Sequence, residues 1–308
     1  MAFCAFTLII IFAGVQNGIE RVSKIMMPIL IVLSVIIAVY SVTRPGALAG
    51  VKYFLVPNVK NFSWMTVVSA MGQMFYSLSI AMGILITFGS YMKKDTAIED
   101  STRNVEIFDT GIAIMAGLMI IPAVFAFSGG DPDTLQAGPS LMFITIPKVF
   151  QNMGFGTVIG IVFFLLVLFA AVTSSIALTE SAVSTFEDEL GWGRKKATVL
   201  VGVIMLALGS LSSLGYGPLA GIKIIGMQFL DLFDFLTNSV MMPIAALLTS
   251  LFVSRVVGID KIEAEIIHGE STFRRKKVFV VMIKYLCPVF AIIILLSSVA
   301  NALGWIKM

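Results

Sequence analysis

The sequence predicts an all-α integral membrane protein, and three observations support this. Of the 308 residues, 58% are hydrophobic and only 13% are charged, and the mean hydropathy is +1.00. These values exclude a soluble domain of ordinary composition. Charge-free windows recur along the chain, and nearly all are at least about as long as the roughly 20 residues that a helix needs to cross hydrocarbon. Because a bilayer offers the backbone no hydrogen-bond partners, such segments are expected to be helices.

Eight membrane helices are expected, one for each apolar window. The first window opens the chain and is short, and the other seven contain no Asp, Glu, Lys or Arg. In order, the windows are 3–15, 25–43, 61–92, 110–130, 149–179, 197–222, 235–254 and 287–306. Proline and glycine predict outside loops at 45–57 and at 129–132. The apolar stretch 141–150 is too short to cross the bilayer, so we expect it to pack as a lid-like loop helix.

The basic residues predict how the helices are oriented. When successive loops are assigned alternately to two sides, fourteen Lys and Arg residues gather on one side and six on the other. The positive-inside rule places the richer side in the cytoplasm, so the first helix runs inward and the chain ends outside. The net charge of +3 reflects this asymmetry and needs no nucleic-acid partner. Met1 lies next to an apolar window without a basic leader, so we expect the middle of a longer protein.

Side chains that often carry metal or nucleophilic chemistry are scarce. Cys4 and Cys287 both fall inside apolar windows, and the single histidine, His268, lies in a charged loop. A disulfide framework and a cysteine or histidine metal site are therefore not expected. An intramembrane aspartyl protease is disfavoured, because Asp109 and Asp234 lack the Tyr-Asp and Gly-x-Gly-Asp contexts that it needs. The sequence does not predict an enzyme.

The stretch GQMFYSLSIAMG, residues 72–83, places serines and glycines near the middle of a membrane window. A single helix over 61–92 would be about 48 Å long, well beyond a hydrocarbon core of roughly 30 Å, so it must tilt or break. A break is tolerated at that depth only where the freed backbone groups face protein, water or a ligand. Freed carbonyls can coordinate sodium, and freed amides can receive an anionic group. A small-residue face for helix packing is the alternative.

A second stretch, LFAAVTSSIALTESAVSTFEDEL, also places polar groups at membrane depth. Ala170, Thr173, Ser174 and Ala177 recur at helical spacing and share one face. The two hydroxyls suit either hydrogen bonding between helices or oxygen ligation of a cation. Glu180 follows in the same helix, and a carboxylate at that depth is costly enough to be a functional candidate.

Three motifs together resemble one family. GQMFYSLSIAMGILITFGSYMKKD, FFLLVLFAAVTSSIALTESAVSTFEDEL and FLDLFDFLTNS are similar to the sixth, eighth and tenth helices of the bacterial neurotransmitter:sodium symporters. The motifs occur in the family's order, and the resemblance covers essentially the whole chain. It begins at the family's fourth helix and ends after its eleventh. With the first three helices missing, we expect an N-terminally truncated and inactive fragment.

The resemblance implies a fold and an activity. The fold is an incomplete inverted-repeat bundle of the LeuT type with a broken sixth-helix equivalent, as a single transmembrane domain over 1–308. Residues 1–65 would form the last two helices of the first repeat, 66–254 the second repeat, and 255–308 the cytoplasmic loop and final helix. The activity is sodium-coupled amino-acid symport by alternating access in a bacterial plasma membrane. A different broken-helix transporter or a channel is the alternative.

The resemblance also assigns residues to two sodium ions and to the substrate. The first sodium would be bound partly by Ser77, and the second by the Ala170 carbonyl with Thr173 and Ser174. The substrate would lie between the unwound stretch, 76–79, its neighbours and the eighth helix. The lining residues would be Phe75, Tyr76, Ser77, Ser79, Met82, Ser175 and Leu178. Because Met82 stands where a pocket aromatic often sits, an adaptable pocket for an apolar or aromatic amino acid is expected.

The seventh helix can be matched to the family in two ways. Anchoring on Gly117 places Asp109 at an asparagine ligand of the first sodium, whereas anchoring on Pro122 places Phe108 there. We favour Asp109, because Phe cannot ligate sodium, and a plain interfacial carboxylate is the alternative. A fixed negative charge at this position would replace bound chloride, so chloride-independent transport is expected.

Gate residues follow from the same resemblance. Asp234 matches the outer-gate carboxylate, and Tyr91 and Asp188 match the inner gate. In the family both carboxylates pair with arginines of the first helix. Gly18 and Pro28 match a glycine and proline pair that permits local unwinding and opens a route inward for sodium. The expected partners are the amino acid and the lipid bilayer.

Overall fold

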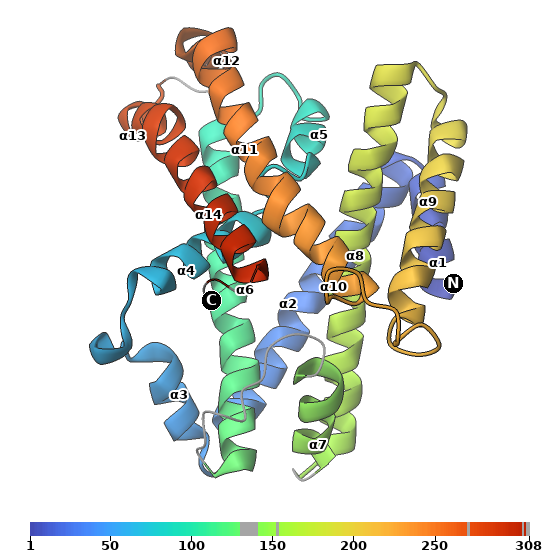
Figure 1. Cartoon of the computed structure of the whole chain (residues 1–308), viewed down its shortest axis with the longest axis vertical. Coiled ribbons are helices and arrows are strands. Elements are labelled where there is room, and N and C mark those ends of the chain that lie inside the picture. The colour runs from blue at the N-terminus through green and yellow to red at the C-terminus, as the bar shows by residue number, and fades with distance from the viewer. Residues whose placement is uncertain (130–140, 152–153, 270–271, 304, 306–308) are drawn as a thin grey trace. The chain divides into compact units, whose positions relative to one another are not determined.

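The computed structural model describes residues 1–129, 141–151, 154–269, 272–303 and 305. In this part of the chain the regular structure is helical, apart from one isolated bridge between Ile224 and Met227 (Figure 1). Six helical segments are long and apolar enough to cross a membrane. They are Val15–Val42, Ile98–Ser128, Gly156–Leu190, Arg194–Leu214, Phe229–Val257 and Lys276–Ala302. The chain is a multi-pass membrane protein, as the apolar windows predicted.

The other two apolar windows take different forms. The opening window is a short helix, α1 (Ala2–Phe12). The long window divides into α4 (Trp64–Ser77) and α5 (Ile84–Ser90), so the broken-helix alternative is the one observed. The stretch 141–150 is helical, as a π-helical turn followed by α7 (Ile146–Gln151).

The loops differ in part from their prediction. The segment expected as a loop at 45–57 contains α3 (Ala47–Leu55), which starts after Gly46 in the left-handed conformation (φ 84°). The glycine there stops the preceding helix and lets the chain turn, so the next nine residues can form a helix. Of the second expected loop, residues 130–132 lie outside the described residues.

Most of the remaining helices overlap the apolar windows, and several extend beyond them: α6 starts twelve residues before its window, and α8 ends eleven residues after its window. The N-terminal ones are α2 (Arg21–Val42), α6 (Ile98–Ser128), α8 (Gly156–Leu190) and α9 (Arg194–Leu214). A π-helical turn, Val15–Glu20, precedes α2. The C-terminal ones are α10 (Phe229–Asp234), α11 (Met242–Leu251), α12 (Ile259–Gly269), α13 (Lys276–Val281) and α14 (Cys287–Ala302). Three π-helical segments continue these helices. Phe235–Met241 joins α10 to α11, Phe252–Val257 follows α11, and Met282–Leu286 joins α13 to α14.

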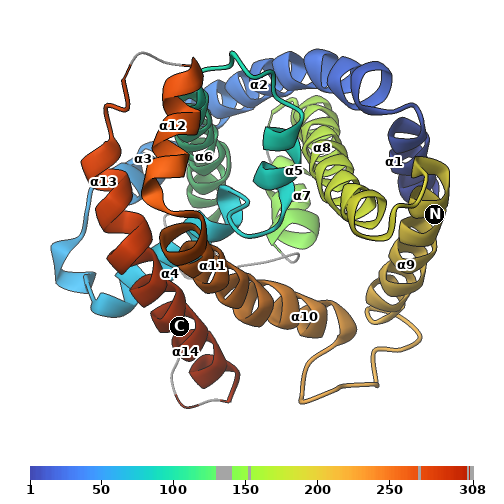
Figure 2. The ribbon, with the colours of Figure 1, turned by 90° about the horizontal axis from the view of Figure 1, so that it is seen from above.

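The contacts divide the chain into two units that interleave along the sequence. The first unit contains Met1–Phe12, Ser63–Glu106 and Ala177–Met308. In it α11 packs along α14 and α1 packs along α9 (Figures 1 and 2). Its core includes Phe75 of α4, which is 4% exposed and packs with Met242 and Ala246 of α11. The break after α4 is therefore held against α11 and α14.

The second unit contains Ala13–Phe62 and Ile107–Ile176. Its core joins α2, α6, α7 and α8 through buried apolar side chains such as Ile37, Val124, Val149 and Phe163. The helix α7 contributes fully to this core, since Ile146, Val149 and Phe150 are all buried. Close helix packing is visible at Gly50 of α3, where an added Cβ would lie 2.8 Å from the Cα of Pro122 on α6.

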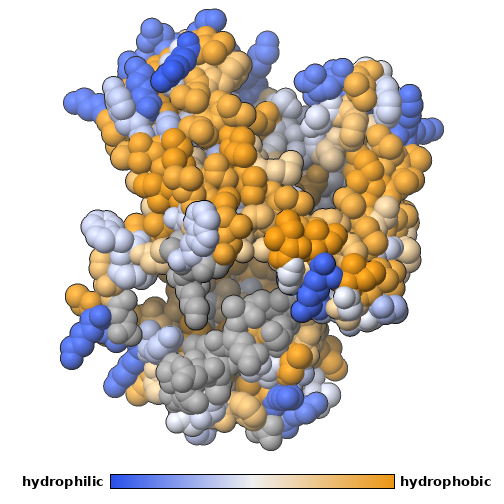
Figure 3. All heavy atoms as spheres, in the orientation of Figure 1, coloured by the Kyte–Doolittle hydropathy of each residue, from blue (hydrophilic) through white to orange (hydrophobic). Residues whose placement is uncertain are grey.

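The surface of the protein is rich in exposed hydrophobic side chains, as expected for a protein surrounded by lipid. On the face shown in Figure 3, hydrophobic residues cover α11, α13 and α14, and hydrophilic residues gather over α12. Many large apolar side chains are exposed, including Val32, Leu248 and Leu296. An exposed apolar surface of this extent indicates contact with lipid.

Candidate functional site

The break between α4 and α5 is an irregular stretch of backbone inside an apolar window of the first unit. A capping box at Ser63 and Thr66 starts α4, which ends at Ser77. Ser79, Ala81 and Gly83 then have positive φ values of 54°, 62° and 79°. For the two residues that carry a Cβ, this conformation costs on the order of 1–2 kcal/mol each. Strain of this kind gathers at functional sites, where the surrounding structure holds it in place.

The position of the break differs from the expected one. The resemblance implied an unwound stretch over 76–79, but Tyr76 and Ser77 complete the last turn of α4, and the non-helical residues are 78–83. Gly83 explains the later restart, because α5 needs a left-handed residue at its N-cap and glycine supplies it without a steric penalty.

Three side-chain hydrogen bonds attach the broken segment to α8. Ser181 donates to the backbone oxygen of Met82 at 3.4 Å, close to the break. The hydroxyls of Thr87 and Ser184 lie 3.1 Å apart, and Tyr91 donates to Glu180 at 2.8 Å. Each hydrogen bond between membrane helices contributes about 0.6 kcal/mol on average. Because the three bonds are spaced along the segment from Met82 to Tyr91, they hold α5 in one orientation against α8.

A cavity of about 500 Å³ adjoins the break. It contains three of the residues expected to bind substrate, Tyr76, Met82 and Leu178. The α10–α11 segment supplies the opposite wall, including Met241 and Met242, which the sequence analysis did not name. We call this the methionine cavity. Its volume suits a small organic ligand, and its thioethers form an apolar lining that adapts to different shapes.

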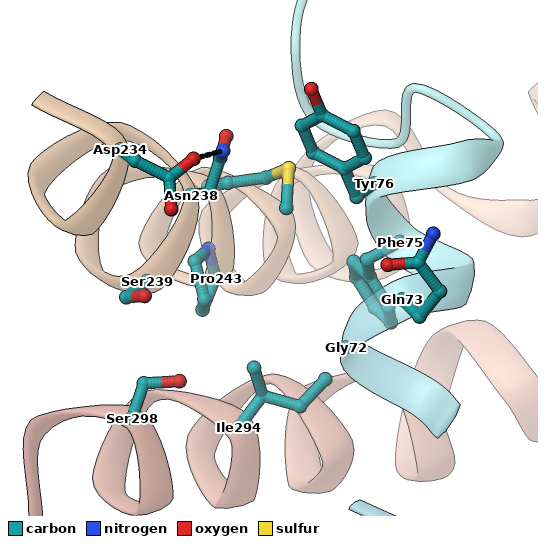
Figure 4. A pocket seen from close by; sticks show the side chains of 11 residues that line it. Gly72, Gln73, Phe75, Tyr76, Asp234, Asn238, Ser239, Pro243, Ile294 and Ser298 are labelled. Atoms are coloured by element: carbon teal, nitrogen blue, oxygen red, sulfur yellow. Dashed lines mark hydrogen bonds between the residues drawn. The ribbon is translucent and has the colours of Figure 1, made fainter. Parts of the chain in front are cut away.

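A second cavity, of about 370 Å³, lies between α4, the α10–α11 segment and α14. Figure 4 shows its polar groups: Gln73 and Tyr76 from α4, Asp234 and Asn238 from the α10–α11 segment, and Ser298 from α14. The side-chain amide of Asn238 donates to Asp234 at 2.6 Å. The expected outer-gate carboxylate thus lies beside the Asn238 amide, with Gln73 and Tyr76 across the cavity on α4. A carboxylate with neighbouring amides and hydroxyls suits a cationic partner.

The expected ligands of the second sodium lie on α8, in the second unit. Thr173 donates its hydroxyl hydrogen to the backbone oxygens of Phe169 and Ala170, at 3.1 and 3.0 Å. This leaves the lone pairs of the Thr173 oxygen available beside the Ala170 carbonyl, and Ser174 next to it is exposed. Ser175, the expected substrate contact on the neighbouring face, is half-buried.

The expected ligands of the first sodium lie in different units. Ser77 is exposed at the end of α4 in the first unit, and Asp109 is half-buried on α6 in the second. Their pairing around one ion stays a prediction. Ser77 and Ser79 line neither of the two cavities described above.

A buried ion pair lies at the end of α5. Glu180 on α8 is fully buried, and Arg194 at the start of α9 contacts both of its oxygens, at 2.6 and 3.0 Å. The Arg194 Nε also donates to the backbone oxygen of Ile11 on α1 at 3.0 Å. With the Tyr91 hydroxyl, the pair joins four helical segments, and we call it the Glu180 cluster.

One of the two residues expected at the inner gate belongs to the Glu180 cluster, and the role of both as a gate stays a prediction. Tyr91, one of the two residues assigned to that gate, donates to Glu180, while Asp188 is exposed and forms no ion pair within the described residues. Sequence reasoning singled out Glu180 but missed Arg194. The signal was present: a carboxylate at membrane depth needs a cation, and Arg194 follows the glycine-rich turn after α8.

The expected hinge pair lies on one continuous helical stretch of the second unit. Gly18 is buried in the π-helical turn, and its amide bonds the Gly14 oxygen at 3.1 Å. Pro28 lies inside α2, where it removes one backbone hydrogen bond. Both are weak points of regular helix, and π-helical turns often occur at functional positions.

The sequence and fold are similar to those of known transporters. The profile of the sodium:neurotransmitter symporter family matches residues 1–305. A sodium-dependent transporter of Bacillus subtilis, YhdH, is 34% identical over 97% of this chain and 66% of its own length. A sodium-dependent transporter of Haemophilus influenzae is 31% identical over 97% of this chain and 64% of its own length.

A solved structure shares the fold. The crystal structure of MhsT in complex with L-phenylalanine matches with a TM-score of 0.83 and 35% identity, over 96% of this chain and 66% of that chain. The chain thus spans slightly less than two thirds of the length of these relatives.

Proposed function

This chain belongs to the sodium:neurotransmitter symporter family, and we propose that it carries ion- and substrate-binding parts of a sodium-coupled amino-acid symporter that works by alternating access. The observation that supports this most strongly is the break at 78–83, held between α4 and α5 beside the methionine cavity. A strained break at membrane depth needs a ligand, water or protein for its freed backbone groups. In secondary transporters, such breaks form the binding sites for substrate and ion.

The proposed substrate class is an apolar or aromatic amino acid. The methionine cavity offers thioethers from Met82, Met241 and Met242, with the Tyr76 ring and Leu178 beside them. Sulfur–aromatic contacts contribute about 0.3–1.5 kcal/mol each, which favours an aromatic side chain over a charged one. The bound L-phenylalanine of MhsT, a protein 35% identical to this chain, supports the same class.

The proposed cofactors are two sodium ions bound by oxygen. For the second ion the ligands are the Ala170 carbonyl and the hydroxyls of Thr173 and Ser174, which lie on one α8 face. For the first ion they include Ser77 and Asp109. Hard cations prefer carboxylate, carbonyl and hydroxyl oxygens, and the fixed charge of Asp109 would make chloride unnecessary.

We propose that sodium binding and substrate binding are coupled because each ligand completes the binding site of the other. When substrate and sodium each supply part of the other's binding site, the affinity of each rises in the presence of the other by the same factor. The gates would be Asp234 on one side, and Tyr91 and Asp188 with the Glu180 cluster on the other. Gly18 and Pro28 would allow the opening toward the sodium-releasing side.

An uptake experiment tests the substrate class. Because the chain spans 54–66% of the length of its curated relatives, the experiment compares the chain with a form carrying a family-type three-helix segment before Met1. Proteoliposomes receive an inward sodium gradient and labelled phenylalanine. Competition by leucine and tryptophan, and none by glutamate or lysine, is the expected result. Equal competition by charged amino acids would contradict the assigned class.

A further inference from the structure

A third cavity, of about 500 Å³, lies between the start of α6, α12 and the start of α13, and shares no lining residue with the two cavities near the break. Most of its lining is apolar, with Ile98, Ile266, Phe273, Phe279 and Met282. The segments α12 and α13 lie side by side in both views of the ribbon (Figures 1 and 2). We call this the α12 cavity, and neither the expected sodium sites nor the expected substrate residues include any part of it.

Three of the polar residues that line the α12 cavity, Arg275, Glu99 and Glu106, interact with one another. Arg275 donates to Glu106 at 2.8 Å and lies 4.0 Å from Glu99. The backbone amides of Arg274 and Arg275 also donate to the two oxygens of Glu99, at 2.9 and 3.0 Å. The hydrogen bond and charge of Glu106 raise the pKa of Arg275, so this guanidinium stays charged. The loop before α13 is thereby fixed to the start of α6.

The third carboxylate of the lining, Glu265, is outside this network. Glu265 on α12 lines the cavity and forms no hydrogen bond or ion pair with any residue in the described part of the chain. The lining therefore carries three carboxylates against one guanidinium, and that guanidinium already belongs to Glu106 and Glu99. The exposed carboxylate of Glu265 is thus available to a positively charged group at the polar end of the cavity. Two exposed cations, Arg274 and Lys277, lie outside this lining but directly beside it in sequence.

The cavity lies at the charged ends of two of the long apolar helices. The spans Ile98–Ser128 and Lys276–Ala302 both begin with charged residues here and become apolar further on. Val278, which lines the cavity one turn into the second span, is 63% exposed. The lining ends one to two helical turns before the charge-free windows that start at residues 110 and 287. A lipid whose head group lies at this level can extend its acyl chain along the apolar side chains while its polar end stays hydrated.

We propose that the α12 cavity binds a membrane phospholipid whose head group carries an ammonium, such as phosphatidylethanolamine. The acyl chain would lie against Phe279 and Met282. The ammonium would pair with Glu265, and the phosphate would face Arg274 and Lys277. A lipid with an anionic head group and no ammonium could pair with Arg274 and Lys277 but would offer no partner to Glu265. A soluble amine lacks the chain that the apolar lining needs.

Lipid binding to the purified full chain in detergent tests the proposal. Native mass spectrometry compares phosphatidylethanolamine and phosphatidylglycerol with identical acyl chains. We expect the ammonium lipid to bind several-fold more tightly. Glu265→Gln is expected to weaken its binding by about 2–5-fold, the size of one partly exposed ion pair, and to leave the anionic lipid unchanged. Asp260→Asn, an exposed acid on α12 outside the lining, is the matched control.

A second pair of variants tests the location. Thr102→Trp places a large ring in the cavity and should weaken binding of both lipids at least about tenfold, while Arg103→Trp, on the neighbouring exposed position outside the lining, should not. Val278→Trp repeats the test from α13 should the first variant lower the unfolding temperature. Equal binding of the two lipids, or Glu265→Gln matching Asp260→Asn, would overturn the assigned chemistry. Unchanged binding in the cavity-filling variants would overturn the site.

Discussion

Truncating Arg194 to alanine is predicted to destabilise the protein by about 3–5 kcal/mol. The guanidinium makes two bonds to Glu180, at 2.6 and 3.0 Å, and one to the Ile11 oxygen at 3.0 Å. Because the Glu180 side chain is 0% exposed in the intact chain, the variant leaves a deeply placed carboxylate that keeps only the Tyr91 hydroxyl as donor within the described residues.

Replacing Glu180 by glutamine is predicted to cost less, about 1–2 kcal/mol. The Arg194 side chain is 24% exposed, so its guanidinium can reach water when its partner is neutral. The new amide also keeps an oxygen that accepts from Tyr91. The asymmetry between the two variants follows from their unequal burial, and a simple count of lost bonds would not give it.

The assay is unfolding of the purified chain in mixed detergent and dodecyl sulfate micelles, followed by circular dichroism. The double variant Arg194→Ala/Glu180→Gln should be more stable than Arg194→Ala alone, because it buries no unpaired charge. Glu187→Gln is the control, since Glu187 lies 3.5 Å from Arg194 and is 27% exposed, and should change stability by less than about 1 kcal/mol. An Arg194→Ala variant as stable as this control would refute the reasoning, as would additive losses in the double variant.

Three further predictions concern glycines and chloride. Gly83→Ala should destabilise the chain by about 1–2 kcal/mol, because φ is 79° and the new Cβ would lie 2.6 Å from a serine hydroxyl, whereas Gly72→Ala, with open space around it, should be neutral or stabilising in the same assay. Gly50→Ala should cost about 1–3 kcal/mol because its Cβ would press on the α6 backbone at 2.8 Å, and Gly111→Ala, with no atom within 4 Å, is the control that should not lower the unfolding midpoint. Sodium-driven uptake by the extended form should be unchanged when gluconate replaces chloride, and a chloride requirement would contradict the role assigned to Asp109.

The membrane helices could be predicted because hydrocarbon leaves the backbone few choices. A charge-free window of sufficient length must form a helix, so α6, α8 and α9 follow from composition alone. The break was one of two outcomes predicted from length, since a helix over 61–92 is too long for one upright span and must tilt or break. Its exact extent was not, because the broken segment packs against residues distant in sequence, as in the Ser181 hydrogen bond to the Met82 oxygen.

The candidate site was predictable where one helix carries it. Thr173 and Ser174 share a face of α8, and helical spacing alone shows this. Met241, Met242 and Arg194 were missed, because their roles arise when segments distant in sequence pack together. A buried carboxylate at Glu180 could have prompted a search for its cation, and that signal would have found Arg194.

The most direct test of the central proposal is the sodium dependence of amino-acid binding. Labelled phenylalanine is bound to the chain, and to the form with the three-helix segment before Met1, in sodium or in potassium. We predict sodium-dependent binding in the extended form, weakened at least about tenfold by Thr173→Ala. Thr185→Ala, which removes the same kind of hydroxyl from an exposed position on α8, should leave it unchanged. Equal binding in sodium and potassium, or equal effects of the two threonine variants, would contradict the proposed symport.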